Sequence, residues 1–213
     1  MPKPGRAGSE TGAALLLALA AAALITAVAA SLVVSASIET TIVGSARAAQ
    51  EVFYAADAAL ERTLHDLAVA PDWSPALALP PALVASFNDG VSVAKAPDGR
   101  QLSMSALTME RQAVSAVRYG PGVFGADTPA WRMFGHAPLA AVLPGGLLAQ
   151  PGYVLVWVAD YGLDGDGNAA HDANGQLLVY VDAYGVAGAR RGLEAAVARA
   201  GPGVRLLAWK DTR

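Results

Sequence analysis

The sequence predicts an α+β protein in which a long N-terminal helix packs on a C-terminal antiparallel β-sheet. The first observation is a proline-free stretch from Ala7 through Ala70, apolar in its first half and amphipathic in its second. The second is a set of short runs after residue 90, rich in Val, Leu, Tyr and Trp and separated by Gly, Pro, Asp and Asn. Such runs are typical of strands joined by turns. A helix that covers one face of an antiparallel sheet accommodates both observations.

The composition is that of an apolar, cysteine-free chain of one-domain size. The chain has 213 residues, no cysteine and only 15% charged residues, and its mean hydropathy is +0.38. The absence of cysteine excludes disulfides, thiolate catalysis and cysteine-bound zinc. The formal net charge of −3 provides no basic face for phosphate neutralisation, so no nucleic-acid partner is expected.

The N-terminal segment is long enough to cross a lipid bilayer. No charged residue occurs from Thr11 to Ile38, and about 20 apolar residues suffice for a spanning helix. Lys3 and Arg6 precede the segment, so the positive-inside bias places the N-terminus in the cytoplasm and exports the rest of the chain. Two interpretations of this segment are a plain membrane anchor and a secretory signal peptide cleaved near residues 27–29. A third depends on the residues that follow.

The helix is expected to continue beyond the membrane segment as an amphipathic helix. Steps of three and four place one set of apolar side chains on a single face. That set comprises Val52, Phe53, Ala56, Ala59, Leu60, Leu64 and Leu67. Pro71 ends the run, so the pattern predicts one helix of roughly 55 residues, about 80 Å long. Its apolar face must pack on an exported domain.

The N-terminal region resembles type IV pilins and pseudopilins, and more specifically the N-terminal region of the minor-pilin assembly family named PilX. The resemblance rests on Gly12–Leu17, on Ser37–Thr41 and on Phe53–Glu61, where Asp57 replaces the glutamate of the family's "AAEAAL" run. Together these pieces cover residues 8–67. The resemblance implies a pilin-like fold.

The resemblance implies that prepilin peptidase cleaves after Gly12 and leaves Ala13 as an N-methylated terminus. The chain would then divide into a leader (1–12), a transmembrane helix half (13–38), an amphipathic helix half (39–69) and a β-rich periplasmic or extracellular domain (70–213). Most pilins carry Glu at the position of Leu17, where it neutralises the terminal amine of a neighbouring subunit. A buried uncompensated charge is costly, so Leu17 favours an initiating or tip position in the filament.

Short alternating runs predict the strands of the exported domain. Residues 91–95 and 101–107 are expected to form a hairpin, and the other strands are expected at 112–119, 153–161, 176–184 and 204–210. Residues 192–199 fit either a helix or a strand. Residues 70–90 are interpreted as a Pro-rich connector, and residues 120–151 as a long irregular loop.

An Asp-rich segment between the two strongest predicted strands is a candidate Ca²⁺ loop. Four residues fall at positions 1, 3, 5 and 9 of a calcium-loop spacing: Asp164, Asp166, Asn168 and Asp172. Ala169 and Gly175 stand where an EF-hand has Gly and Glu, so the segment is not an EF-hand. The alternative is a wide turn in which Asp, Asn and Gly serve their usual turn roles.

No catalytic motif is present, and the protein is not expected to be an enzyme. The sequence lacks HExxH, GxSxG and P-loop patterns. His65 is expected on the helix as a surface or packing residue, and His136 has no evident partner in its predicted loop. The four tryptophans are expected to fill the core: Trp73, Trp131, Trp157 and Trp209. A ligand-binding surface is the alternative for Trp73 and Trp131, which fall in predicted loops.

Two functions remain open from the sequence. The first is a PilX-like minor pilin that takes part in type IV pilus assembly and reaches the pilus or cell surface from the bacterial inner membrane. Its expected partners are other minor and major pilins, prepilin peptidase, the inner-membrane assembly platform and the lipid bilayer. The second is a membrane-anchored or secreted periplasmic binding module with a Ca²⁺-stabilised Asp-rich loop. They differ at Gly12, because only a pilin loses twelve residues there.

Overall fold

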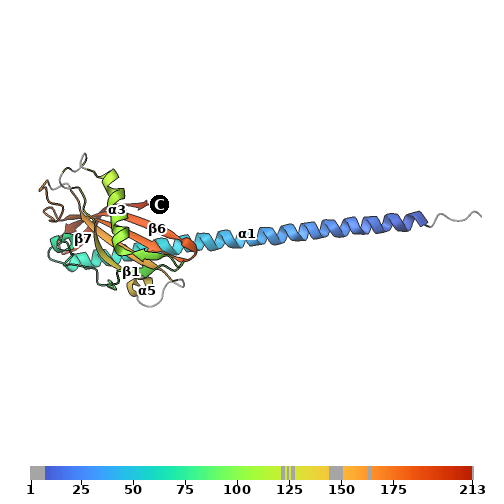
Figure 1. Ribbon diagram of the computed structural model, residues 1–213, viewed down its shortest axis with the longest axis horizontal. Coiled ribbons are helices and arrows are strands. Elements are labelled where there is room, and N and C mark those ends of the chain that lie inside the picture. Colours follow the sequence, from blue (N-terminus) through green and yellow to red (C-terminus); the bar gives the residue numbers. More distant parts are fainter. Residues whose placement is uncertain are drawn as a thin grey trace, which may run out of the picture. The chain divides into compact units, whose positions relative to one another are not determined.

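The computed structural model describes residues 8–120, 123, 125, 128–143, 151–162 and 165–212, with side chains from residue 12 onward. The chain forms two compact units, Met1–Ala46 and Arg47–Arg213, and their boundary falls within the first helix, α1 (Gly8–Val69). Figure 1 shows the elements in sequence colours. The protein is α+β, with a long N-terminal helix and a five-stranded antiparallel sheet in the second unit.

Helix α1 begins before the predicted start of the membrane segment and ends two residues before Pro71. Among the residues that the structure describes, one helix is long and apolar enough to cross a membrane, and its most apolar 18-residue window has a mean hydropathy of 2.5. Its last residue is Val69, because Pro71 disfavours helical backbone at the residue before it. The Trp73 indole Nε1 donates to the carbonyl of Leu67 at 2.8 Å, and the Ala70 N–H donates to the same oxygen at 3.3 Å, so this helix end is capped.

The sheet follows the chain order β3-β4-β5-β6-β7, and every neighbouring pair is antiparallel. The strands are β3 (Arg132–Pro138), β4 (Tyr153–Asp160), β5 (Gln176–Tyr184), β6 (Arg190–Ala200) and β7 (Gly203–Thr212). The two strongest predicted strands, β4 and β5, lie side by side near its centre. In their register, Tyr153 pairs with Tyr184 and Trp157 pairs with Tyr180.

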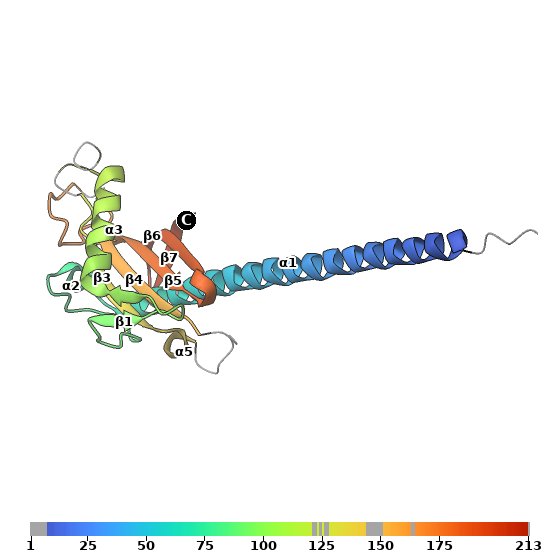
Figure 2. The same ribbon diagram turned by 45° about the vertical axis from the view of Figure 1, so that its right-hand side comes forward.

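Each face of the sheet carries its own core. Side chains alternate between the faces along a strand, so Val154, Val156 and Val158 pack toward α1, while Leu155 and Trp157 pack toward the opposite side. That opposite face is covered by α3 (Met104–Arg118) and by a small hairpin of β1 (Val93–Lys95) and β2 (Gln101–Ser103). Figures 1 and 2 show α3 crossing one face and the C-terminal part of α1 lying on the other.

The predicted strand at 112–119 is wrong, because this segment belongs to helix α3. The Ser103 hydroxyl accepts from the Ala106 N–H and caps the helix start, so the second hairpin strand stops at Ser103 instead of reaching residue 107. Leu107, Arg111 and Ser115 recur every four residues on the face turned to the sheet, and Ser115 is fully buried. The helical period was masked by short polar and apolar alternation.

The predicted loop at 120–151 includes, in its described part, strand β3 and the one-turn helix α5 (Leu139–Val142). The edge of strand β3 that faces away from β4 accepts backbone hydrogen bonds from residues 85–89. Ala85 N–H donates to Phe134 O at 2.7 Å, and Asp89 N–H donates to His136 O at 3.0 Å. This pairing is long-range, which explains why local composition did not reveal the strand. The ambiguous residues 192–199 lie within β6, and the connector 70–90 contains the short helix α2 (Ser74–Leu77).

Candidate functional site

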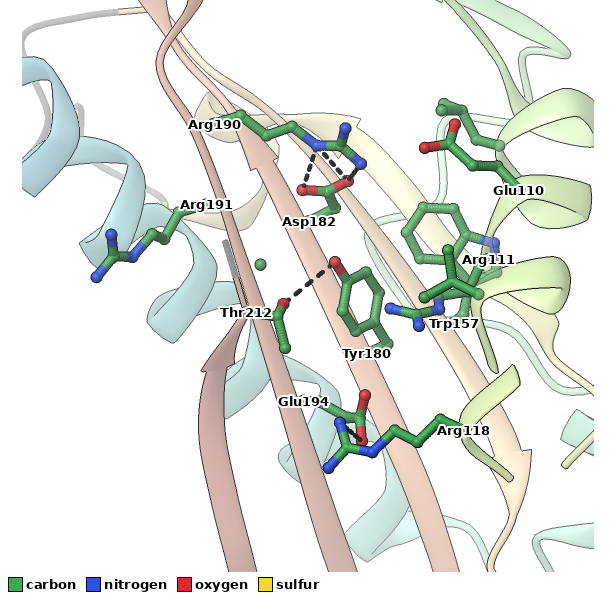
Figure 3. Close-up of a pocket in the computed structure, with 13 residues that line it drawn as sticks. Glu110, Arg111, Arg118, Trp157, Tyr180, Asp182, Arg190, Arg191, Glu194 and Thr212 are labelled. Carbon is green, nitrogen blue, oxygen red and sulfur yellow. Dashed lines mark hydrogen bonds and ion pairs between the residues drawn. The ribbon is translucent and has the colours of Figure 1, made fainter. Parts of the chain in front are cut away.

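A pocket of about 520 Å³ lies between α3 and the face of the sheet that α3 covers. We call it the α3 pocket, and Figure 3 shows its lining. Helix α3 contributes one wall and strands β4 to β7 the other. The lining residues are Leu107, Glu110, Arg111, Val114, Arg118, Trp157, Tyr180, Asp182, Arg190, Arg191, Gly192, Glu194 and Thr212.

A buried ion pair forms one end of the α3 pocket. The Asp182 carboxylate is 1% exposed, and it accepts from Arg190 Nε at 3.0 Å and from Arg190 Nη2 at 2.6 Å. The Tyr184 hydroxyl donates to the same carboxylate at 2.9 Å. Burial raises the pKa of Asp182 above its ordinary value, and the bonds and charge of Arg190 oppose that rise.

A second buried carboxylate, Glu194, lies further along the same pocket. It accepts from Lys210 Nζ at 2.6 Å and from the Tyr119 hydroxyl at 2.6 Å, and Arg118 Nη1 lies 3.8 Å away. Burial and the neighbouring Glu194 raise the pKa of Tyr119 to about 12. Two strong donors therefore hold this carboxylate, and the pairing joins β6, β7 and the end of α3.

Arg111 is the central cation of the α3 pocket. Its guanidinium carbon lies 4.1 Å from the Tyr180 ring centre and 5.5 Å from the Trp131 ring centre. These are cation–π distances. The Nε–H is buried without a hydrogen-bond partner, and Arg111 forms no ion pair with any residue that the structure describes. Arg191 differs, because it points toward α1 and pairs with Asp211 (Figure 3).

The Asp-rich segment has the hydrogen bonding of a turn at the positions that the structure describes. Asp166 accepts from the Asn168 N–H at 2.8 Å and lies 3.0 Å from His171 Nδ1. Asp172 accepts from the Gly175 N–H at 2.7 Å, and Asn168 accepts from the Ala170 N–H at 3.2 Å. Asp164 lies outside the described residues. No group of three or more His, Asp or Glu side chains suited to a metal occurs in the described part of the chain. The Ca²⁺ loop stays a prediction.

The residues expected to carry processing and filament register lie in the first part of α1. Residues 1–7 of the expected leader are outside the described residues, whereas Gly12 and Ala13 are helical. A Cβ added at Gly12 would meet no atom within 4 Å. Leu17 is 72% exposed.

The expected packing face of α1 lies against the sheet. Val52, Ala56, Leu60 and Leu67 are buried in the core cluster, and Phe53 and Leu64 are partly buried against it. Sequence periodicity did not single out Ala55 and Thr63, which are also buried on this face. The Thr63 hydroxyl is satisfied by the Ala59 carbonyl at 2.8 Å.

The predictions for His136 and Trp209 are wrong. His136 does not lie in a loop without partners. It is buried in β3, its Nδ1 lies 2.8 Å from Asp89 Oδ1, and the Tyr153 hydroxyl is 3.1 Å away. Trp209 is not a core residue, because it is 54% exposed on the edge strand β7. Trp73, Trp131 and Trp157 are buried as expected.

Comparisons with known proteins do not place the chain in a family. No family model matches it, and searches of the curated proteins and of the solved structures return no significant match.

The α3 pocket was not predicted from the sequence. Its charged residues come from a helix predicted as a strand and from strands far along the chain, so no local motif marks it.

Proposed function

We propose that the protein is a minor pilin of the PilX type, a non-catalytic subunit that takes part in type IV pilus assembly. The observation that carries the proposal is helix α1. Its first part is apolar on every side, with leucines such as Leu17 and Leu24 more than half exposed. Its second part, from Arg47, packs through one face on an antiparallel sheet. The first part of such a helix can lie in a bilayer, while its second part belongs to a folded domain. This arrangement suits a subunit that is held in the membrane before it enters a filament.

The exposed apolar surface of α1 is the proposed contact with other subunits. Exposed large apolar side chains continue along the helix through Ile38, Ile42 and Val43. In water such a surface would be unfavourable at about 25 cal/mol per Å², so it needs lipid or other helices as partners. The proposed partners are the lipid bilayer before assembly, and minor and major pilins after it.

Leu17 supports an initiating or tip position. The family's glutamate at this position compensates a terminal amine inside an apolar filament core, and leucine offers no such charge. A subunit without it is better suited to a position where no neighbouring amine must be neutralised. The N-terminus is proposed to be cytoplasmic and the β-rich domain periplasmic, in the bacterial inner membrane.

Piliation of the producing bacterium tests this proposal. Deletion of the gene is expected to reduce surface pili, and the wild-type gene is expected to restore them. Gly12→Val should fail to restore them, since a β-branched residue at the expected cleavage site blocks prepilin peptidase. Gly44→Val is the matched control, because Gly44 is also a helical glycine with no atom within 4 Å of an added Cβ. Normal piliation in the deletion strain, or full rescue by Gly12→Val, would reject the proposal.

A further inference from the structure

We infer that the α3 pocket binds a carboxylate carried on an apolar or aromatic body, and that Arg111 is the residue that binds the carboxylate. The inference goes beyond the proposed function and does not depend on it. It rests on the charges, the aromatic surface and the size of the pocket between α3 and the sheet (Figure 3).

Each of the other cations in or beside the pocket has an acidic partner. Arg190 is held by Asp182 through contacts of 2.6–3.0 Å, and Lys210 is held by Glu194 at 2.6 Å. Arg191 is paired with Asp211 and turned toward α1. Arg118 lies at the rim, half exposed and 3.8 Å from Glu194. Arg111 is left as the cation for which the described residues provide no acidic partner.

Arg111 is held in position for a ligand. Its guanidinium lies on the Tyr180 ring and near the Trp131 ring, and its Nε–H is buried. A side chain fixed in this way loses little further freedom on binding. The groups in direct contact with its charge are the aromatic faces of Tyr180 and Trp131, which do not accept the in-plane hydrogen bonds of a guanidinium. A planar carboxylate provides two such acceptors and matches the geometry of a guanidinium.

The pocket favours a single negative charge over a phosphate. The carboxylates of Asp182 and Glu194 line it, and Glu110 on α3 lines it as well. A dianionic phosphate would be repelled by these groups, because like charges within a poorly solvated site interact strongly. One unpaired arginine matches one carboxylate.

The rest of the pocket surface is suited to an apolar group. Trp157 and Tyr180 form the floor on the sheet side, and Leu107 and Val114 project from α3. The polar tip of Trp157 is satisfied, because Nε1 donates to Thr108 Oγ1 at 2.9 Å. About 520 Å³ falls within the range of small-molecule sites, roughly 300–1,000 Å³.

The carboxylate has two possible sources, a free organic acid and the C-terminus of a peptide. Both present the same group to Arg111. The full-length chain in an uncharged detergent would be titrated with 3-phenylpropionate, with its neutral amide, with acetyl-Ala-Ala-Phe as free acid or amide, and with inorganic phosphate. Calorimetry or tryptophan fluorescence would report binding.

We expect a carboxylate to bind at least about tenfold more tightly than its amide, a difference of about 1.4 kcal/mol, and phosphate to bind more weakly than the acid. Binding of both acids supports the inference with either source, and binding of the peptide acid alone supports the peptide source. Equal binding of acid and amide, tighter binding of phosphate, or no binding of either acid would overturn it.

Substitutions of Arg111 test whether this residue binds the carboxylate. Arg111→Gln should weaken carboxylate binding at least about tenfold, and Arg111→Lys should retain part of it because the charge remains without the planar fork. Arg205→Gln is the matched control, since Arg205 is an exposed arginine outside the pocket. Near-ultraviolet circular dichroism would verify that each variant is folded. Unchanged affinity in folded Arg111→Gln or Arg111→Lys would reject the assignment.

Discussion

Arg190 and Asp182 form a bidentate ion pair between neighbouring strands β6 and β5, with Nε–Oδ1 at 3.0 Å and Nη2–Oδ2 at 2.6 Å. The two partners are unequal in burial, because the Asp182 side chain is 2% exposed and that of Arg190 is 40% exposed. The pair therefore compensates a buried carboxylate at the end of the α3 pocket. Removal of the arginine leaves that carboxylate without its main partner.

Arg190→Gln is expected to lower the free energy of unfolding by about 3 kcal/mol near neutral pH, as for other broken buried pairs. The loss should shrink in acid. Burial already raises the pKa of Asp182, and removal of Arg190 raises it further. A carboxyl group with a raised pKa in the folded state contributes stability at low pH that is lost as pH rises through that pKa. The variant loses more than the wild type over this range.

Thermal or denaturant unfolding of the full chain between pH 4 and 7 measures this effect, with Arg205→Gln as the exposed control. A loss in Arg190→Gln that stays the same across that range would contradict the role assigned to Asp182.

His136 and His171 are expected to titrate on opposite sides of pH 6.5. Burial lowers the pKa of His136, against the opposing charge of Asp89. The hydrogen bond that His171 donates to the Asp166 carboxylate raises the pKa of His171. Neutral His136 therefore contributes stability above pH 6.5 that is lost as pH falls below that value, whereas protonated His171 contributes at low pH and its contribution is lost as pH rises through its raised pKa.

NMR titration of the imidazole resonances separates the two histidines, and His136→Gln and His171→Gln assign them. Asp89→Asn should lower the pKa of His136 further, and Asp166→Asn should return that of His171 toward 6.5. A His136 resonance that titrates above 6.5 would show that Asp89, and not burial, dominates its environment.

Gly185 allows α1 to approach the turn between β5 and β6. A Cβ built on Gly185 would collide with Val52 Cγ1 of α1. Gly185→Ala should therefore destabilise the protein by about 1–3 kcal/mol through overpacking. In the double variant with Val52→Ala the combined loss should be smaller than the sum of the single losses.

Gly203→Ala provides the control for this double-mutant cycle, because an added Cβ there would lie 3.9 Å from the Ala200 carbonyl oxygen, at ordinary van der Waals distance. Strict additivity of the Gly185 and Val52 changes would argue against the contact between this turn and α1.

Trp209 is expected to be the most solvent-accessible tryptophan of the protein. It is 54% exposed, whereas Trp73, Trp131 and Trp157 are at most 1% exposed. Trp209→Phe should shift the fluorescence emission to shorter wavelength and remove most of the signal that acrylamide quenches. Trp131→Phe should leave the quenchable fraction in place. Persistent quenching in Trp209→Phe would contradict the exposure of β7.

Sequence pattern predicted the elements that carry long apolar runs or a regular apolar face. The second half of α1 has apolar side chains that repeat with the helical period, and the central strands β4 and β5 are almost continuous apolar runs; the structure has these elements with small changes of bounds. Helix α3 and strand β3 were missed for a different reason. Leu107 and Arg111 face a charged pocket instead of a purely apolar core, and β3 depends on backbone bonds from residues 85–89.

Distance along the chain explains why the pocket charges could not be paired from the sequence. Tyr119 and Glu194 are 75 residues apart, and Arg190 reaches Asp182 only because the β5–β6 turn brings the strands together. Trp209 was assigned to the core from its residue type alone. It lies on an edge strand, where neighbouring elements leave half of its surface exposed.

The N-terminus of the mature protein tests the proposed pilin function most directly. Intact mass and terminal peptide sequencing would be carried out on protein from cells with and without a working prepilin peptidase. The proposal predicts a chain that begins at N-methylated Ala13 when the peptidase is present and at the unprocessed N-terminus when it is absent. A chain that begins at Met1 or near Ala30 in cells with the peptidase would contradict the pilin function and favour an anchored or secreted binding module.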